Sequence, residues 1–308
     1  MYICGEQFKN ICDFYFYYDD LYAKNDHIIY HNLNSNKNKT EIKGHSFNPN
    51  RTNQNISLQQ HNIDINCIFD NCLIFMNFSF VGTFIVSILS KIKININIII
   101  HNTDLSIGKN ISELLNNKYI NTVWSQNIDL KHKKLFPIPI GIANHRIRRT
   151  GIYVPHSDVN IIKKVENMDI KKNNKIYVDF HLHIDKHNHR KSCLEQIGYL
   201  DNYIFKNDKR QDFLENCKTV KSCKYILSPH GNGLDCHRTW GGLIFKTIPI
   251  VKTSTLDDLY KDLPVIIVNN WNDIDFEKLL TFKTEDFKDI CTIEYWRKKI
   301  YKKINREL

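Results

Sequence analysis

Residues 224–251 read KYILSPHGNGLDCHRTWGGLIFKTIPIV, and they decide the fold that we expect. Tyr225–Leu227 is a short apolar run, typical of a buried strand. Ser228–Gly233 ends it, because proline lacks a backbone donor and Asn-Gly favours positive φ. Asp235 is predicted to cap a following helix, and Ile248–Val251 is a second buried strand. The stretch therefore predicts a strand, a glycine-bearing loop, a helix and a strand, as in α/β folds.

The loop and the helix start carry the groups of an anion-binding site. Free N–H groups at a helix start attract anions, and Gly231 and Gly233 let an anion approach the backbone closely. The Arg238 guanidinium suits phosphate oxygens, and His230 and His237 supply further donors. The alternative is an ordinary βαβ turn whose polar residues only cap the helix.

The segment SPHGNGLDCHRTW, from Ser228 to Trp240, resembles the signature of the exostosin-like glycosyltransferases when it is read together with Ile248–Val251. This family is common in algae, protists and large DNA viruses. Two further stretches resemble segments of the same family. They are Ile99–Asp104 (IIHNTD), and Ser125–Asp129 (SQNID) together with Pro137–Asn144 (PIPIGIAN). The resemblance covers about residues 65–300, most of the chain.

The resemblance implies a GT-B-like α/β fold, with two Rossmann-like domains whose parallel sheets face a central cleft. The N-terminal, acceptor-side domain is expected at residues 1–150, with a variable extension at 1–50. An inter-domain stretch is expected at 151–174, the domain that binds the nucleotide-sugar donor at 175–290, and a C-terminal helix at 291–308.

The resemblance also implies a reaction, the transfer of a sugar from a nucleoside diphosphate sugar to a hydroxyl of a glycan or glycoprotein, with inversion. A UDP-sugar is expected in preference to a GDP-sugar. No metal or other cofactor is expected, so fixed donors must stabilise the leaving diphosphate. Asp104 is the expected general base, with His101 and Asp129 as alternatives, and His230 is a further catalytic candidate.

Two sets of binding residues follow from the same motifs. The donor set comprises Arg190, Ser228, His230, Gly231, Asn232, Gly233, Asp235, His237, Arg238 and Ser254. The acceptor-side set comprises Asn102, Asn127 and Asn144.

Two positions depart from the family pattern. Gly241 replaces the Glu that follows Trp, and Lys246 replaces the Gly that precedes x-Ile-Pro. The missing Glu is expected to meet the ribose or sugar of the donor. The alternative function is therefore a catalytically degenerate protein that binds a nucleotide sugar or a glycan. A nicotinamide enzyme is disfavoured, because Cys236 stands where G-x-G-x-x-G requires its third glycine.

Composition narrows the class of protein and its partners. The 308 residues carry a formal net charge of +10, which also suits nucleic-acid binding. The lysines are dispersed, however, and a basic surface suits a nucleotide sugar, so no nucleic-acid partner is expected. The nine cysteines follow no regular spacing, and the N-terminus lacks the features of a signal peptide. We therefore expect reduced thiols and a cytoplasmic protein, in the host cytoplasm or the virion if the chain is viral.

One uncharged stretch is long enough to raise the question of a membrane span. Cys72–Leu89 holds 18 residues without a charge, the lower limit for such a span. Its polar residues favour instead a strand to about Asn77 and a buried helix from about Ser79 to Leu89. No stable membrane span is expected, and a membrane anchor is the alternative.

Polar residues also follow the predicted strands Ile92–Ile100 and Ile120–Trp124, at the edge where ligands bind in open α/β sheets. The alternative is that they only form loops and cap helices. Phe14–Tyr18 predicts a packed strand or hairpin, and the tract Asn32–Lys43 predicts an exposed loop.

Three other features have two interpretations each. The histidines at 181, 183, 187 and 189 form either a zinc site or a loop at the domain cleft, with Arg190 facing phosphate. Asp273-Ile274-Asp275 is either a metal signature or, as we prefer, a helix cap. The basic helix Thr292–Ile304 either packs across the domains or lies on a membrane surface.

Overall fold

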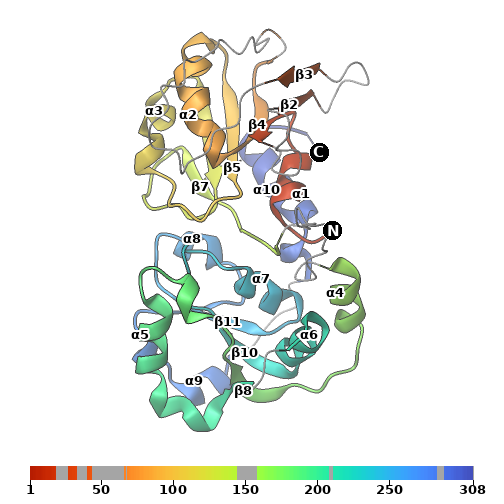
Figure 1. Ribbon diagram of the computed structural model, residues 1–308, viewed down its shortest axis with the longest axis vertical. Helices are drawn as coiled ribbons and strands as arrows, with labels where there is room; N and C mark the ends of the chain where they lie inside the picture. Colours follow the sequence, from red (N-terminus) through yellow and green to blue (C-terminus); the bar gives the residue numbers. More distant parts are fainter. Residues whose placement is uncertain are drawn as a thin grey trace.

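The computed structural model describes residues 1–18, 27–32, 40–43, 66, 68–143, 158–207, 211–282 and 288–307. The chain forms two lobes, each built around its own β-sheet, and Figure 1 shows them one above the other. Helices α1 (Gly5–Asn10) and α10 (Ile293–Lys303) lie along one side of this pair.

The first lobe holds a seven-stranded sheet in the order β3-β2-β1-β4-β5-β6-β7. Its parallel part comprises β1 (Phe14–Tyr18), β4 (Cys72–Asn77), β5 (Ile96–His101), β6 (Ile120–Ser125) and β7 (Leu135–Pro137). Strand β5 is buried along its whole length, as expected for an apolar run covered on both faces. Helices α2 (Phe78–Ser87) and α3 (Ser112–Asn116) pack beside these strands.

Two strands of this sheet correct the sequence predictions. β2 (His27–Asn32) pairs antiparallel with β1, and β3 (Thr40–Lys43) pairs antiparallel with β2. The first sheet is therefore mixed rather than parallel throughout. The prediction that residues 32–43 form only an exposed loop is wrong for Thr40–Lys43. The alternating β-branched and polar residues of this segment suit an edge strand.

The second lobe holds a five-stranded sheet in the order β12-β11-β10-β8-β9, with all strands parallel. Its strands are β8 (Asn173–Tyr177), β9 (Ile204–Phe205), β10 (Cys223–Leu227), β11 (Ile248–Lys252) and β12 (Ile266–Val268). Its helices are α4 (Val159–Glu166), α5 (His189–Gln196), α6 (Phe213–Ser222), α7 (His237–Ile244), α8 (Asp257–Tyr260) and α9 (Phe276–Leu280). The predicted unit of strand, loop, helix and strand is confirmed as β10, α7 and β11.

The two sheets meet at the carboxyl ends of their strands. Asn127, just after β6, packs against Gly233, which follows β10. The hydroxyl of Thr255, which follows β11, donates to the carbonyl of Ile128. Two α/β lobes that face each other through these ends form the GT-B-like arrangement.

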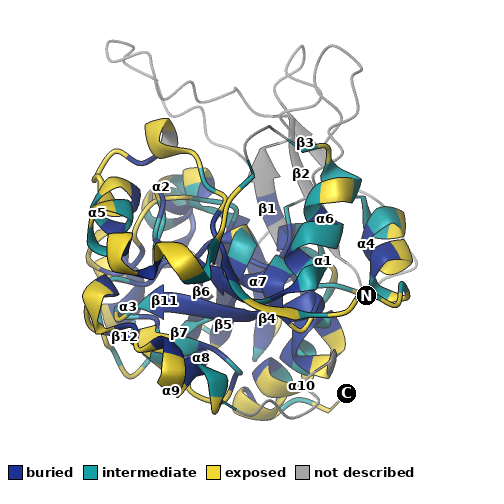
Figure 2. Ribbon diagram, turned by 90° about the horizontal axis from the view of Figure 1, so that it is seen from below, coloured by how far each residue is buried: buried dark blue, intermediate teal, exposed yellow. Residues whose placement is uncertain are grey.

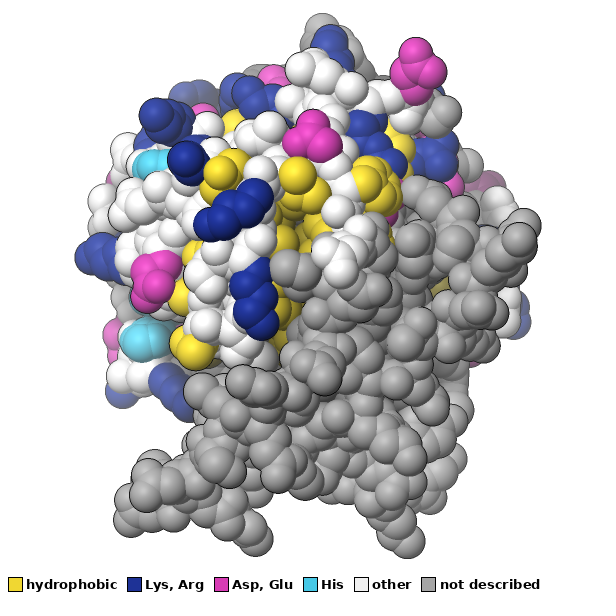
Figure 3. Space-filling view, turned by 90° about the horizontal axis from the view of Figure 1, so that it is seen from above, with side chains coloured by type: hydrophobic (Ala, Val, Ile, Leu, Met, Phe, Trp, Pro, Cys, Tyr) yellow, Lys and Arg dark blue, Asp and Glu magenta, His cyan; other side chains and the backbone are white. Residues whose placement is uncertain are grey.

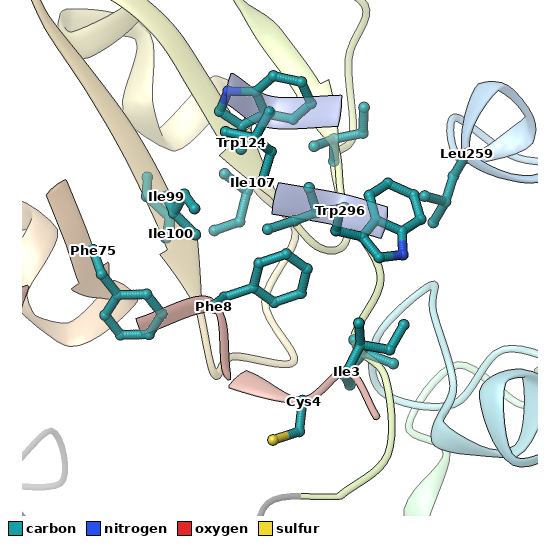
Figure 4. Close-up of a cluster of buried hydrophobic side chains, with 14 of the residues drawn as sticks. Ile3, Cys4, Phe8, Phe75, Ile99, Ile100, Ile107, Trp124, Leu259 and Trp296 are labelled. Atoms are coloured by element: carbon teal, nitrogen blue, oxygen red, sulfur yellow. The ribbon is translucent and has the colours of Figure 1, made fainter. Parts of the chain in front are cut away.

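The N-terminal residues and α10 complete the core of the first lobe. Figure 4 shows Ile3, Phe8 and Trp296 among buried side chains of the sheet. The backbone N–H of Ile3 donates to Cys291 at 3.0 Å, so the two ends of the chain are joined. In Figure 2, the described part of the chain has buried strands at the centre and exposed residues on outer helices such as α5 and α9. The first residues of the expected variable extension thus contribute to the core.

Helix α10 contacts both lobes. The Trp296 ring packs edge-to-face on Trp240 of α7, with centroids 6.2 Å apart. At the other end, the Asn71 side-chain amide donates to the carbonyl of Ile304 at 2.8 Å. The Arg306 guanidinium binds the buried Asp13 carboxylate in bidentate fashion, at 2.7 and 2.8 Å. A helix held this way restrains how far the lobes can move apart.

Two local predictions are confirmed. The uncharged stretch from Cys72 forms strand β4 and helix α2, and within the described residues no helix is long and apolar enough to span a bilayer. Asp275 accepts the N–H of Lys278 and so caps α9, while Asp273 accepts the N–H of Asn270. The Asp-Ile-Asp segment therefore serves as helix caps.

Candidate functional site

The loop after β10, Ser228–Gly233, lies at the carboxyl edge of the second sheet, and we call it the glycine loop. Its base is fixed, because the buried Ser228 hydroxyl lies 2.9 Å from the hydroxyl of Thr239 in α7. Its tip is closed by a bond from the N–H of Gly231 to the carbonyl of Gly233, at 3.1 Å. Asn232 at the tip is exposed, so a ligand can reach the loop.

The Arg190 guanidinium lies directly against the glycine loop. A Cβ atom at Gly231 would stand 2.6 Å from Arg190 Nη2, so only glycine allows this approach. Arg190 is buried, and its Nη1 donates to the carbonyl of His181 at 2.7 Å. Its Nε is also buried, and no described residue accepts from it. The sequence prediction that Arg190 and the loop belong to one site is consistent with this contact.

A second guanidinium, that of Arg238 in the first turn of α7, lies near the first. Its Nε donates to the carbonyl of Asp179 at 2.9 Å, and its plane lies over the Phe180 ring at 5.2 Å. Its Nη1 is buried without an acceptor among the described residues. Burial lowers the pKa of Arg238, and the nearby charge of Arg190 lowers it further. Arginine stays charged even so, which makes this a site of concentrated positive charge.

A cavity of about 200 Å³ adjoins Arg238. Its wall includes apolar side chains from α4, α6 and α7, and Tyr177, Asp179 and Asn216 supply polar groups. Asp179 Oδ2 accepts from the Tyr177 hydroxyl at 3.1 Å and from the Asn216 amide at 2.8 Å. These bonds hold the carboxylate in place. Gly241 also lines the cavity, and a Cβ there would meet no atom within 4 Å.

Asp235 occupies a different position from the predicted one. The prediction that it caps the helix is wrong by one residue, because Cys236 is the N-cap, and its thiol donates to the carbonyl of Pro229 rather than capping the helix. The Asp235 carboxylate is buried and accepts four bonds, from the N–H groups of Ile140 and Cys236, from Trp240 Nε1 and from the Tyr260 hydroxyl. Burial raises the pKa of Asp235, and these bonds oppose that shift. A carboxylate enclosed in this way is not accessible to a nucleotide-sugar substrate.

Several predicted site residues instead join the lobes. His237 donates from Nδ1 to the carbonyl of Gly141 at 2.7 Å. The Asn127 side chain is fully buried, and its Oδ1 accepts the N–H of Asp235 at 2.8 Å. Asn127 Nδ2 donates to Thr103 at 3.0 Å. This placement argues against an acceptor-binding role for Asn127, because the glycine loop covers it.

His101 is enclosed in the first lobe. It is 1% exposed, its ring packs on Phe8, and its Nε2 donates to the carbonyl of Pro139 at 3.0 Å. Burial lowers the pKa of His101 to about 4. Asn102 lies beside it, with Oδ1 3.1 Å from His101 Nδ1 and a bond from its amide to Asn77. Both observations argue against the prediction that His101 acts as a base.

The remaining candidates are placed as follows. Asp104 is exposed in the loop after β5. Asp129 Oδ1 accepts the N–H of Lys109, which gives this alternative base a capping role. Ser254 accepts the N–H of Leu256 and so stabilises the start of α8. Asn144 lies outside the described residues.

Two of the four clustered histidines, His187 and His189, line a small cavity of about 170 Å³ with His230 and Lys252. The rings of His189 and His230 meet edge-on at 5.6 Å. Burial, together with the nearby His189, lowers the pKa of His230 to about 4, so its imidazole is neutral at neutral pH. Across the described part of the chain, no group of three or more His, Cys, Asp or Glu side chains is placed to hold a metal ion.

The sequence interpretation did not include Asp179, Asn216 or the Ile140–Gly141 backbone in the site. Asp179 comes two residues after β8, at the sheet edge where ligands bind, but the strand expected at Lys175–Phe180 included it. Nothing local distinguishes Asn216 within its helix.

Comparisons with known proteins complete the description. No protein-family model matches the sequence, and no curated protein matches it. The fold is similar to a chain from E. coli described as trehalose-6-phosphate bound with UDP-2-fluoro glucose, at 10% identity, over 79% of this chain and 75% of that one, with a TM-score of 0.41. It is also similar to the N-terminal domain of trehalose-6-phosphate phosphatase from Candida albicans, at 13% identity, over 78% and 68% of the chains, with a TM-score of 0.37.

Proposed function

We propose that this chain is an exostosin-like glycosyltransferase that uses a nucleoside diphosphate sugar. One observation carries the proposal. The Arg190 guanidinium lies against the glycine loop, the Arg238 guanidinium lies near that of Arg190, and each keeps a buried nitrogen without an acceptor among the described residues. Buried donors are nearly always paired, so these two point to a ligand with several acceptor oxygens. A diphosphate supplies such oxygens and the opposite charge.

The cavity beside Arg238 suits the nucleoside of the same donor. Its apolar walls accommodate a base, with the half-buried Phe213 at its edge. The fixed carboxylate of Asp179 accepts the hydroxyls of the ribose. It thereby supplies the charge that Gly241 lacks, since both residues line this cavity. A UDP-sugar is the donor that we propose.

The chemical step is an inverting transfer to a hydroxyl of a glycan or glycoprotein. The acceptor oxygen bonds to the anomeric carbon, the bond from that carbon to the diphosphate oxygen breaks, and the acceptor proton passes to a base. Asp104 is the proposed base, because it is exposed at the carboxyl edge of the first sheet. Negative charge grows on the departing diphosphate, and Arg190 and Arg238 are already placed to stabilise it.

A second candidate is a protein that binds a nucleotide sugar without turning it over. Two observations favour it. Gly241 leaves an open space where the family has a carboxylate, and Asn127 and Asp235 are committed to the contact between the lobes.

The test is incubation of the purified chain with a panel of UDP- and GDP-sugars and candidate acceptor glycans, with release of nucleoside diphosphate as the readout. The proposal predicts turnover with at least one donor. It also predicts that Asp104→Asn abolishes turnover and leaves donor binding unchanged. Donor binding without turnover would establish the second candidate. A chain that shows no binding and no turnover would refute both candidates.

A further inference from the structure

A larger groove, of about 750 Å³, lies at the junction of the two lobes and α10. It shares no lining residue with the cavity beside Arg238. Ile128 and Phe136 come from the first lobe, Thr255 and Leu259 from the second, and Asn305 from the segment after α10. Five lysines also line it, and we call it the lysine groove. They are Lys131, Lys261, Lys299, Lys302 and Lys303.

The positive charge of this groove is mostly unneutralised. Among the described residues that line the groove, only Asp258 and Asp262 carry carboxylates. The Lys131 ammonium lies 3.9 Å from the Asp258 carboxylate. Within the described part of the chain, none of the other four lysines has a carboxylate within 4 Å. Bringing like charges together in a concave surface costs free energy, and a bound anion offsets that cost.

Two of these lysines are held in place by aromatic rings. The Lys303 ammonium lies 4.8 Å from the Phe136 ring centroid, and the Lys299 ammonium lies 5.0 Å from that of Trp296. Lys302 and Lys303 stand three and four residues after Lys299, so all three project from one face of α10. This arrangement contrasts with the outer face of the first lobe. In Figure 3, the Lys and Arg side chains of the part of that face that the structure describes are scattered.

We propose that the lysine groove binds a small molecule with two or more phosphate groups, and that this molecule contacts both lobes and α10 at once. Single-stranded nucleic acid fits less well, because it requires exposed rings on which bases stack. Trp124 is 3% exposed, and Lys303 covers Phe136. A bilayer fits less well, because the lysines line a concave site. The proposal is independent of the proposed function, since it concerns other residues and a direct binding measurement.

The experiment is calorimetric titration of the full chain with inorganic tripolyphosphate at physiological salt. Replacing Lys299, Lys302 and Lys303 together by Gln should weaken binding by roughly tenfold or more, because each lysine donates charge-assisted bonds. A variant with Arg at the same three positions should retain the affinity of the unchanged chain for tripolyphosphate. A control variant with Gln at the exposed Lys118, Lys163 and Lys164 should bind within about twofold of the unchanged chain.

A second arm identifies the source of the phosphates. If the natural ligand is a phosphorylated sugar, fructose 1,6-bisphosphate should also bind, and Asp258→Asn should weaken it through loss of an acceptor for hydroxyls. If it is an oligophosphate, only tripolyphosphate should bind, and Asp258→Asn should strengthen it. The proposal is overturned if neither probe binds, or if the control variant loses as much affinity as the variant with Gln at Lys299, Lys302 and Lys303. It is also overturned if Arg238→Ala removes tripolyphosphate binding while the variant with Gln at those three groove lysines retains it.

Discussion

The Asp235 carboxylate accepts the backbone N–H of Ile140 at 2.7 Å, across the junction of the two lobes. The same carboxylate binds Trp240 and Tyr260 within the second lobe. It therefore ties the end of the first lobe to the helix that carries Arg238. We regard this as the contact that fixes the position of the glycine loop relative to the first lobe.

Asp235→Asn should destabilise the fold by about 2–3 kcal/mol, because an amide presents N–H groups to donors that require an acceptor. Chemical denaturation monitored by Trp fluorescence measures the change. The exposed Asp169→Asn is the matched control and should have no effect beyond about 0.5 kcal/mol. Equal stability of the two variants would show that the buried carboxylate is not required.

Asp179 should set the preference for a ribonucleotide. Asp179→Asn should weaken UDP binding by roughly tenfold or more, since it removes a charged acceptor from the cavity. Binding of 2′-deoxy-UDP should change much less, so the ratio of the two affinities should fall toward one. A variant that weakens both nucleotides equally would show that Asp179 acts on the fold rather than on the ribose.

Gly241 distinguishes an adapted site from a decayed one. Gly241→Ala should stabilise the helix by about 0.5–1 kcal/mol and leave UDP affinity unchanged, because the added Cβ meets open space. Gly241→Glu should weaken UDP binding at least several-fold, because a second carboxylate would fill the cavity and stand near Asp179. A large gain in affinity with Glu would instead mean that the site has lost a residue it needs.

The buried His101 should make the protein sensitive to acid. Its pKa is lowered by burial from 6.5 to about 4. Between these two values the imidazole is protonated in the unfolded chain and neutral in the folded chain. Stability from this group is complete above about pH 6.5 and is lost as the pH falls toward 4, at up to about 1.4 kcal/mol per pH unit. Denaturation midpoints across this range should show a shallower slope for His101→Gln. The exposed His183→Gln should keep the original slope, and a His101→Gln variant with that same slope would contradict the account.

The sequence was sufficient where the signals are local. The apolar runs around Tyr225 and Ile250 form adjacent parallel strands, and the loop that follows the first of them carries the proline and glycines that prevent a strand. Asp275 caps its helix as predicted. In each case the residues that decide the structure lie within a few positions of one another.

The sequence was insufficient where the partners are distant. Asp235 has the residue type and position of a helix cap, but its partner Ile140 lies 95 residues away. His101 follows a strand, as many ligand-binding residues do, yet Phe8 from the N-terminal segment covers it. Neither contact has a periodic pattern, so only the folded arrangement shows that these groups are enclosed.

The most direct test is calorimetric titration of UDP into the unchanged chain and into Arg238→Ala. The account predicts that UDP binds and that the variant binds it roughly 10- to 150-fold more weakly, which corresponds to the loss of one charge-assisted bond of about 1.5–3 kcal/mol. The exposed Lys163→Ala serves as the control and should not change the affinity. Absence of UDP and GDP binding, or equal affinities for the unchanged chain and Arg238→Ala, would contradict the assignment of this site to a nucleoside diphosphate.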